Sequence, residues 1–240
     1  MSLVATTLGR LLSFNESGLD RAVPKADGPL DTADFPWMAE IQAHWAEIAA
    51  EVEAVRASEV RLPQVNDLAG SDQGNEGSWS NLVIFSYGTW IEVNQQRCPR
   101  TAELVRNVPG LQIAGFTVLG PGAHLPRHRG PVRGALRYQV GVIVPDPPGS
   151  NRIQVGSVTH VWSPGASMVF DDAVEHEAWN DSDGERFVLF IQFVWPVPGL
   201  TGLLNRAIQR MFSLAARGFP KRVKELDAML NAPADTTLVP

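Results

Sequence analysis

The 240-residue sequence has a single cysteine, no excess of basic residues and no long uninterrupted apolar run. The one cysteine, Cys98, excludes an intramolecular disulfide and is consistent with a reducing cytoplasm. A formal net charge of -6 argues against a nucleic-acid partner, because such a partner calls for a basic surface. No apolar stretch reaches the roughly 18 residues of a transmembrane helix. The first residues have too short an apolar segment and too little positive charge for a signal peptide. We therefore expect a cytoplasmic protein without a transmembrane segment.

What the sequence does contain predicts one large domain with helical flanks. Residues 1–33 show no sustained periodicity, and we expect them to form an irregular N-terminal arm. The main domain is expected over residues 34–198. It opens with an amphipathic helix whose apolar residues recur at helical spacing, namely Ile41, Trp45, Ile48, Val52 and Val55.

Residues 199–240 are expected to form a helical tail with more basic than acidic residues. Its apolar stripe consists of Leu204, Ile208, Met211, Phe212 and Ala215. Two interpretations stay open. The tail either covers the domain or makes a dimer contact, or its residues 200–231 lie along a membrane surface.

Two apolar runs, residues 136–144 and 186–194, have the period of β-strands. In the first run Arg137 and Gln139 share one face, and in the second Arg186 shares a face with alternate apolar residues. Both faces are otherwise mostly apolar, which is typical of strands in a barrel or sandwich with little solvated surface. Turn sequences such as DPPGSN and WSPGAS separate further short strands. The pattern predicts a mainly β protein.

Each of two segments places a histidine in a polar turn and an arginine about ten residues later. Neutral imidazole is the commonest metal ligand among side chains, and two imidazoles with open coordination positions form the core of non-haem Fe(II) oxygenase sites. Arginine pairs bidentately with carboxylates and stays charged when buried. His128 and His176 are therefore candidate metal ligands. Arg137 and Arg186 are candidate binding groups for an anionic co-substrate such as 2-oxoglutarate.

Other polar residues near these segments are weaker candidates for a role in the site. His124 lies four residues before His128, but an intervening proline predicts a loop rather than a helix that would bring the two together. His160 is expected to point outward from a strand. One of Asp171 and Asp172 is expected to accept the second N–H of the nearby candidate ligand, as carboxylates commonly do beside metal-bound imidazoles.

The chain resembles the aspartyl/asparaginyl β-hydroxylase family of Fe(II)/2-oxoglutarate-dependent oxygenases over roughly residues 111–197. The resemblance rests on the elements HxGP, LRY, VG, W..G, FDD, EHE.WN and R.VLF, in that order. The motifs HRGP and GALRY, together with FPW near residue 36 and Cys98-Pro99, resemble those of the bacterial branch that includes lipid A acyl-chain hydroxylases. The family implies a mainly β fold with a double-stranded β-helix (jelly roll, cupin-like) core and flanking α-helices.

The resemblance also implies roles for single residues. It implies that His128 and His176 bind Fe(II), that Arg186 pairs with the distal carboxylate of 2-oxoglutarate, and that Arg137 lies near the other end of that ligand. Thr117 stands where the family commonly has a small hydroxyl residue that contacts the co-substrate.

Two positions depart from the family pattern. Gln139 replaces a histidine, which keeps a hydrogen-bonding group and removes a titratable one. Gly130 stands where ordinary oxygenases of this kind carry a carboxylate ligand, and this implies a third metal position open to water or another anion.

The expected function is that of a 2-oxoglutarate-dependent non-haem iron dioxygenase with O2 as the second co-substrate. The expected substrate for hydroxylation is an aspartyl or asparaginyl unit of an amino acid or peptide. Three alternatives stay open. One is hydroxylation of a lipid acyl chain, and another is halogenation, since Gly130 leaves room for a chloride. The third is a catalytically inactive jelly-roll binding module, which Gln139 favours.

Overall fold

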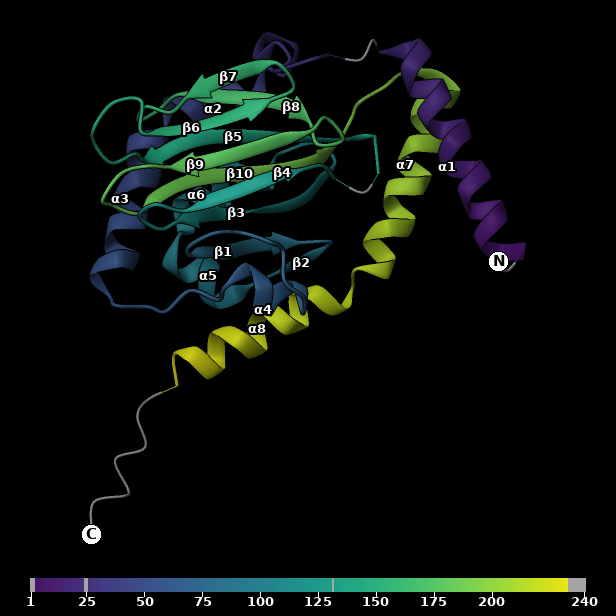
Figure 1. Ribbon diagram of the computed structural model, residues 1–240. Coiled ribbons are helices and arrows are strands. Elements are labelled where there is room, and N and C mark those ends of the chain that lie inside the picture. The colour runs from purple at the N-terminus through teal and green to yellow at the C-terminus, as the bar shows by residue number, and fades with distance from the viewer. Residues whose placement is uncertain (1–2, 24–25, 131, 233–240) are drawn as a thin grey trace.

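The computed structural model describes residues 3–23, 26–130 and 132–232 and has two antiparallel β-sheets at its centre (Figure 1). The larger sheet has the strand order β2-β1-β3-β10-β5-β8, and the smaller has the order β4-β9-β6-β7. The strands are β1 (Trp79–Ser86), β2 (Thr89–Trp90), β3 (Leu111–Leu119), β4 (His124–His128), β5 (Ala135–Ile143), β6 (Asn151–Val155), β7 (Val158–Val161), β8 (Ser167–Asp171), β9 (His176–Asn180) and β10 (Arg186–Val194).

Strands β3 to β10 have the connectivity of a jelly roll. Strands β3, β5, β8 and β10 lie in the larger sheet and β4, β6, β7 and β9 in the smaller, so most connections cross between the sheets. Strand β10 lies between β3 and β5, and β9 lies between β4 and β6, which gives two Greek keys around one interior. The predicted fold class, a mainly β double-stranded β-helix with flanking α-helices, is confirmed.

The strand parity read from the sequence is confirmed as well. Leu136, Tyr138 and Val140 of β5 lie in the large core between the sheet and the helices, together with alternate residues of β10. The opposite face of β5 and β10 turns toward the space between the two sheets, where Val188 joins a second apolar cluster. Arg137, Gln139 and Arg186 are on this inner face, so the sandwich interior contains the candidate site residues.

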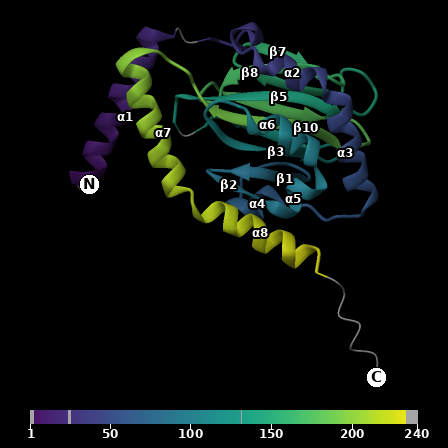
Figure 2. The ribbon, with the colours of Figure 1, turned by 180° about the vertical axis from the view of Figure 1, so that it is seen from behind.

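Helices cover the outer face of the larger sheet (Figure 2). The predicted helix after residue 34 is present but broken in two, α2 (Trp37–Ala43) and α3 (Trp45–Ala57). The break is at His44, whose ring Nδ1 lies 2.8 Å from the carbonyl oxygen of Glu40 and whose backbone leaves the helical region. The other short elements are the 3-10 turn η1 (Thr32–Asp34), α4 (Val65–Ala69), α5 (Glu92–Arg97) and α6 (Pro99–Arg106).

The predicted irregular arm is wrong for most of its length, because Leu3–Ala22 forms the helix α1. The helix is fixed by contacts with residues distant in sequence. Leu19 is fully buried, and Asn15 donates to the side-chain oxygen of Asn205 in the tail over 3.4 Å. Asp20 pairs with Arg133. Residues 1–2 and 24–25 of the arm lie outside the described residues.

The predicted tail forms two helices, α7 (Gly199–Ala215) and α8 (Gly218–Leu230), and its residues 233–240 lie outside the described residues. Helix α7 lies beside α1 in both views, at one end of the sheets (Figures 1 and 2). Its buried side differs from the predicted stripe: Asn205, Ile208 and Gln209 are buried, whereas Met211 and Ala215 are exposed. Hydrogen bonds from the two amide side chains replace apolar packing there.

Helix α8 packs on β1 through Val223. None of the helices within residues 3–23, 26–130 and 132–232 combines the length and the apolar character that a bilayer crossing requires. The predicted domain limits at residues 33/34 and 198/199 stay a prediction.

Candidate functional site

The two candidate metal ligands are direct neighbours across two antiparallel strands. His128 ends β4, His176 begins β9, and the two residues are paired in the register of the smaller sheet. Their ring centroids are 4.2 Å apart. His176 is buried with 4% of its surface exposed, while His128 is exposed at the edge of the interior. The topology thus brings together two imidazoles that are 48 positions apart in the sequence.

Both imidazoles are held in the same way. Nδ1 of His128 lies 2.8 Å from the carbonyl oxygen of Pro126, and Nδ1 of His176 lies 2.8 Å from that of Val174. A carbonyl can only accept, so each Nδ1 carries the proton and each Nε2 is left with its lone pair. The Nε2 of His176 is buried without a hydrogen-bond partner. Two oriented imidazoles with free Nε2 atoms are the donor set that a divalent metal ion requires.

The electrostatic surroundings keep the buried imidazole neutral. Burial, followed by His128 and Arg137, lowers the pKa of His176 to about 4, although Asp172 acts in the opposite direction. A histidine must be neutral to bind a metal ion, so at neutral pH no proton competes at this position.

Arg186 supplies a buried positive charge to the same interior. It begins β10, is 3% exposed, and donates from Nη1 to the carbonyl oxygen of Trp179 over 3.3 Å. Its Nε has no partner, and among the described residues no carboxylate lies within 4.0 Å of the guanidinium. Burial lowers the pKa of Arg186 to about 9. A buried cation without a counter-charge is costly, and an anionic ligand would offset that cost.

Arg137 is held differently, because it already has a carboxylate neighbour. Its Nε lies 3.1 Å from Oδ1 of Asp172, and its Nη2 donates to Oδ2 of Asp172 over 3.3 Å and to the side chain of Gln192 over 3.1 Å. Gln192 is its register partner on β10. Asp172 Oδ1 also lies 3.8 Å from Nε2 of His176. The carboxylate therefore stands between Arg137 and the imidazole pair.

The expectation that an aspartate accepts the Nδ1 proton of His176 is wrong, since the carbonyl of Val174 does so. Asp171 instead accepts from Nε of Arg133 over 2.9 Å. Asp172 approaches the Nε2 side of the imidazole, where a metal ion would sit. Among the described residues no group of three His, Cys, Asp or Glu side chains is placed to share one metal ion.

All six predicted site residues line one cavity of about 210 Å³ between the sheets. They are His128, His176, Arg137, Arg186, Thr117 and Gln139. The hydroxyl of Thr117 accepts a hydrogen bond of 2.8 Å from the indole N–H of Trp79. Apolar side chains complete the walls, and they come from both sheets, from α4 and from α8: Val65, Val83, Ile113, Leu125, Ile153, Phe190 and Phe219.

A second chamber of about 320 Å³ shares four residues with the first, including His128 and Arg137. Its walls contain three amide side chains, Gln112, Gln192 and Gln209, and the phenyl ring of Phe212. Gln209 and Phe212 belong to α7, so the tail helix forms part of this wall. The two chambers together lead from Arg186 past the histidines to α7.

Sequence reasoning missed Trp79, which lines both chambers and lies 6.5 Å from His128 between ring centroids. A glycine-rich loop precedes it in the sequence. Its residue Glu76 pairs with His124 on β4, which places the end of the loop beside the candidate ligand strand. His124 itself is on a strand rather than in the expected loop, where it stacks on Trp179 at 5.2 Å and faces Glu177.

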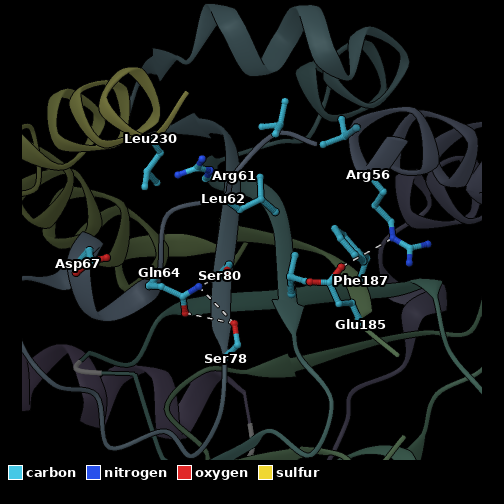
Figure 3. Close-up of a pocket in the computed structure, with 13 residues that line it drawn as sticks. Arg56, Arg61, Leu62, Gln64, Asp67, Ser78, Ser80, Glu185, Phe187 and Leu230 are labelled. Atoms are coloured by element: carbon cyan, nitrogen blue, oxygen red, sulfur yellow. Dashed lines mark hydrogen bonds and ion pairs between the residues drawn. The ribbon is translucent and has the colours of Figure 1, made fainter. Parts of the chain in front are cut away.

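A larger cavity of about 580 Å³ lies apart from the histidines, between α3, the end of α8 and the larger sheet (Figure 3). Its polar residues bind one another. Gln64 donates to the hydroxyls of Ser78 and Ser80 over 3.3 and 2.7 Å, and Arg56 lies 3.9 Å from Glu185. Arg61 and Asp67 line this cavity as well, and its lining contains no histidine or cysteine.

Comparison with known proteins identifies the family of the chain. The family described as aspartyl/asparaginyl β-hydroxylase matches residues 42–196. A relative from Rhizobium tropici, named ornithine lipid ester-linked acyl 2-hydroxylase, is 39% identical over 183 residues, which cover 75% of this chain and 65% of the relative. The human aspartyl/asparaginyl β-hydroxylase is 28% identical over 188 residues, which cover 75% of this chain and 24% of the human protein.

The chain thus spans less than two thirds of the length of these relatives. Among solved structures, a Pseudomonas putida prolyl-4-hydroxylase matches with a TM-score of 0.39 and 20% identity, covering 64% of this chain and 87% of that one. Because the family match extends over well beyond half of the sequence, the chain belongs to the aspartyl/asparaginyl β-hydroxylase family.

Proposed function

We propose that this protein is an Fe(II)- and 2-oxoglutarate-dependent dioxygenase that hydroxylates an unactivated C–H bond of a lipid acyl chain. One observation carries the proposal. Arg186, buried and without a carboxylate partner, lines the same cavity as two imidazoles whose Nε2 atoms are free. A metal ion and a dicarboxylate would satisfy both sets of groups at once.

The residues fit Fe(II) through His128 and His176. Both imidazoles are oriented by backbone carbonyls, and the low pKa of His176 keeps that ligand deprotonated. When bound, Fe(II) with 2-oxoglutarate and O2 supplies the oxidising power that converts a C–H bond to C–OH, while 2-oxoglutarate leaves as succinate and CO2. The side chains around the metal position bind and orient the co-substrate and the substrate.

Arg186 fits the distal carboxylate of 2-oxoglutarate. Its planar guanidinium pairs with a carboxylate in a bidentate way, and its burial makes the pairing stronger than at a surface. Thr117 lines the same cavity and holds a hydroxyl near the ligand, although Trp79 already donates to its oxygen. Arg137 stands beside the metal position, where its charge balances Asp172.

The cavity walls favour an acyl chain over an aspartyl unit. A cationic cup would suit an acidic side chain, but of the two arginines that line the second chamber, Arg129 and Arg137, the latter is already paired with Asp172. The walls of the first cavity are largely apolar and include Leu125 and Phe190. The stronger similarity to a lipid acyl hydroxylase than to the human aspartyl/asparaginyl enzyme supports the same choice.

The test is a side-by-side turnover assay with Fe(II), ascorbate and 2-oxoglutarate. One substrate is an ester-linked acyl lipid with an amino-acid headgroup, and the other is an aspartate-containing peptide. We expect succinate formation coupled to the gain of one oxygen atom by the acyl chain, measured by mass spectrometry. If only the peptide gained oxygen, the substrate would be an aspartyl unit rather than a lipid acyl chain. Chlorine gain in the presence of chloride would identify a halogenase. Binding of 2-oxoglutarate without any turnover of either substrate would favour a binding module.

A further inference from the structure

Helix α7 presents an apolar stripe to solvent on the side that faces away from the sheets. Leu200, Leu203, Met211 and Leu214 are exposed by 84%, 56%, 39% and 46%. With 3.6 residues per turn, these positions and the exposed Ala207 follow one another along a single face. The opposite face, with Asn205, Ile208 and Gln209, is buried against the domain. An exposed apolar stripe of this kind is typical of an interaction surface.

The charges beside this stripe identify what kind of partner fits. Helix α7 contains no acidic residue, and Arg206 and Arg210 lie on one flank of the stripe. Arg217 follows two residues after the end of the helix. All three are exposed, and none of them forms an ion pair with a carboxylate among the described residues. An apolar stripe flanked by free arginines matches the boundary of an anionic lipid bilayer.

Helix α1 lies beside α7 and adds two further exposed apolar side chains. Leu11 and Phe14 are exposed by 38% and 67%, and the exposed Arg10 is next to them in the sequence. Six of the ten large apolar side chains that are exposed in the described part of the chain thus belong to these two helices. The two helices stand together at one end of the sheets, away from α2, α3 and α6 (Figures 1 and 2).

The inner side of α7 connects this surface with the candidate site. Gln209 and Phe212 line the chamber that also contains His128 and Arg137. Phe212 is next to Met211 and two residues before Leu214, so this part of α7 carries the chamber wall on one side and the apolar stripe on the other. A chain that leaves a bilayer at α7 has a short path to the imidazole pair.

We propose that α1 and α7 form a membrane-docking surface that binds anionic bilayers and places the mouth of the second chamber at the lipid. Binding to the bilayer does not depend on the proposed hydroxylase activity. The delivery of a lipid chain to the site rests on that proposed function.

The test is flotation of the full-length protein with vesicles of phosphatidylcholine, with and without phosphatidylglycerol. We expect binding to the mixed vesicles that weakens at high salt, because exposed arginines act through screened charges. The double variant Leu200→Gln with Leu203→Gln should bind at least about tenfold more weakly, since two buried leucines are lost from the contact. Glutamine keeps the helix propensity of leucine.

Exposed valines elsewhere provide a matched control. Val158 and Val161 on β7 are exposed by 43% and 48% and are not on the terminal helices, so Val158→Gln with Val161→Gln should leave vesicle binding unchanged. Equal binding by the two double variants, or no binding by the native protein, would overturn the proposal. A dimer in solution that Leu200→Gln with Leu203→Gln dissociates, without vesicle binding, would overturn it in favour of contact between two copies.

Turnover assays distinguish the docking proposal from the proposed hydroxylase activity. The double variant on α7 should hydroxylate a detergent-dispersed lipid at the native rate and a vesicle-embedded lipid more slowly. Vesicle binding without any turnover would leave the docking surface supported and the hydroxylase assignment refuted. Native turnover on vesicles by the double variant would refute the role of α7 in delivery.

Discussion

Asp172 occupies the space that a side chain at Gly130 would need. A Cβ on Gly130 would lie 2.2 Å from Oδ2 of Asp172 and 3.1 Å from its backbone oxygen, which accepts the N–H of Gly130 over 2.7 Å. The sequence suggested an open metal position at Gly130. The structure places a carboxylate there from the other side, held by Arg137. The acidic group beside the histidines thus comes from the end of β8 rather than from the turn after His128.

The first prediction concerns this packing. Gly130→Asp should lower the free energy of unfolding of the metal-free protein by about 1–3 kcal/mol, the usual cost of forcing extra atoms into a packed site. In an Asp172→Gly background the same substitution should cost much less, because the space is free. Urea denaturation of the four proteins forms a double-mutant cycle. Additive effects would show that the two positions do not compete for space.

The second prediction concerns the metal ligands. His128→Ala and His176→Ala should each weaken Fe(II) binding by more than the roughly 10- to 100-fold that the loss of a second-shell partner costs. A site with two protein ligands has no ligand to spare. The control is His124→Ala, because His124 lies on the same strand but faces Glu177. Anaerobic calorimetry measures the affinities, and native affinity in either His128→Ala or His176→Ala would refute the assignment.

The third prediction concerns the co-substrate. Arg186→Ala should weaken 2-oxoglutarate binding to the metal-loaded protein by about 2–4 kcal/mol, the scale for removing one partner of a desolvated charge pair. Arg186→Lys should recover only part of this, since an ammonium cannot form the two parallel hydrogen bonds of a guanidinium. Arg127→Ala is the control, because Arg127 is exposed and pairs with Glu177 outside the cavity. Equal affinities for the alanine variants of Arg186 and Arg127 would exclude Arg186 from the binding site.

The jelly roll could be predicted because the alternation of residues along its central strands is visible in the sequence. In β5 the alternation of Arg137 and Gln139 with Leu136 and Tyr138 distinguishes the inner face from the core face, and the structure keeps that division. Helix α1 was not predicted, although Val4, Leu8, Leu12 and Leu19 are spaced as on one face of a helix. Its stability depends on contacts with α7, such as Asn15 with Asn205, that are about 190 residues distant in sequence.

The site could be predicted only in part for a related reason. The six residues named from the sequence do line one cavity. The histidines and arginines could be named from their own chemistry, whereas Thr117 and Gln139 were named through the family resemblance. Trp79 and Gln192 were named on neither ground. Gln192 lies at the site because the strand register pairs it with Arg137. Trp79 lies there through its hydrogen bond to Thr117. Asp172 was named, but its approach to Nε2 rather than Nδ1 of His176 depends on the fold of the turn that joins them.

The last prediction is a pH dependence of the metal-free protein. Burial and the neighbouring His128 and Arg137 lower the pKa of His176 to about 4 in the folded state, against an ordinary value of about 6.5. As the pH falls below about 6.5, the unfolded chain therefore takes up this proton before the folded protein does, and stability is lost progressively down to about pH 4. His176→Gln removes the titrating group, so its free energy of unfolding should fall less between pH 7.5 and pH 5 than that of the native protein. Burial lowers the pKa of His160 in the same direction, and His160→Gln measures that separate contribution. A difference between the native protein and His176→Gln that stays constant across this range would show that the imidazole titrates normally and is not held neutral for a metal ion.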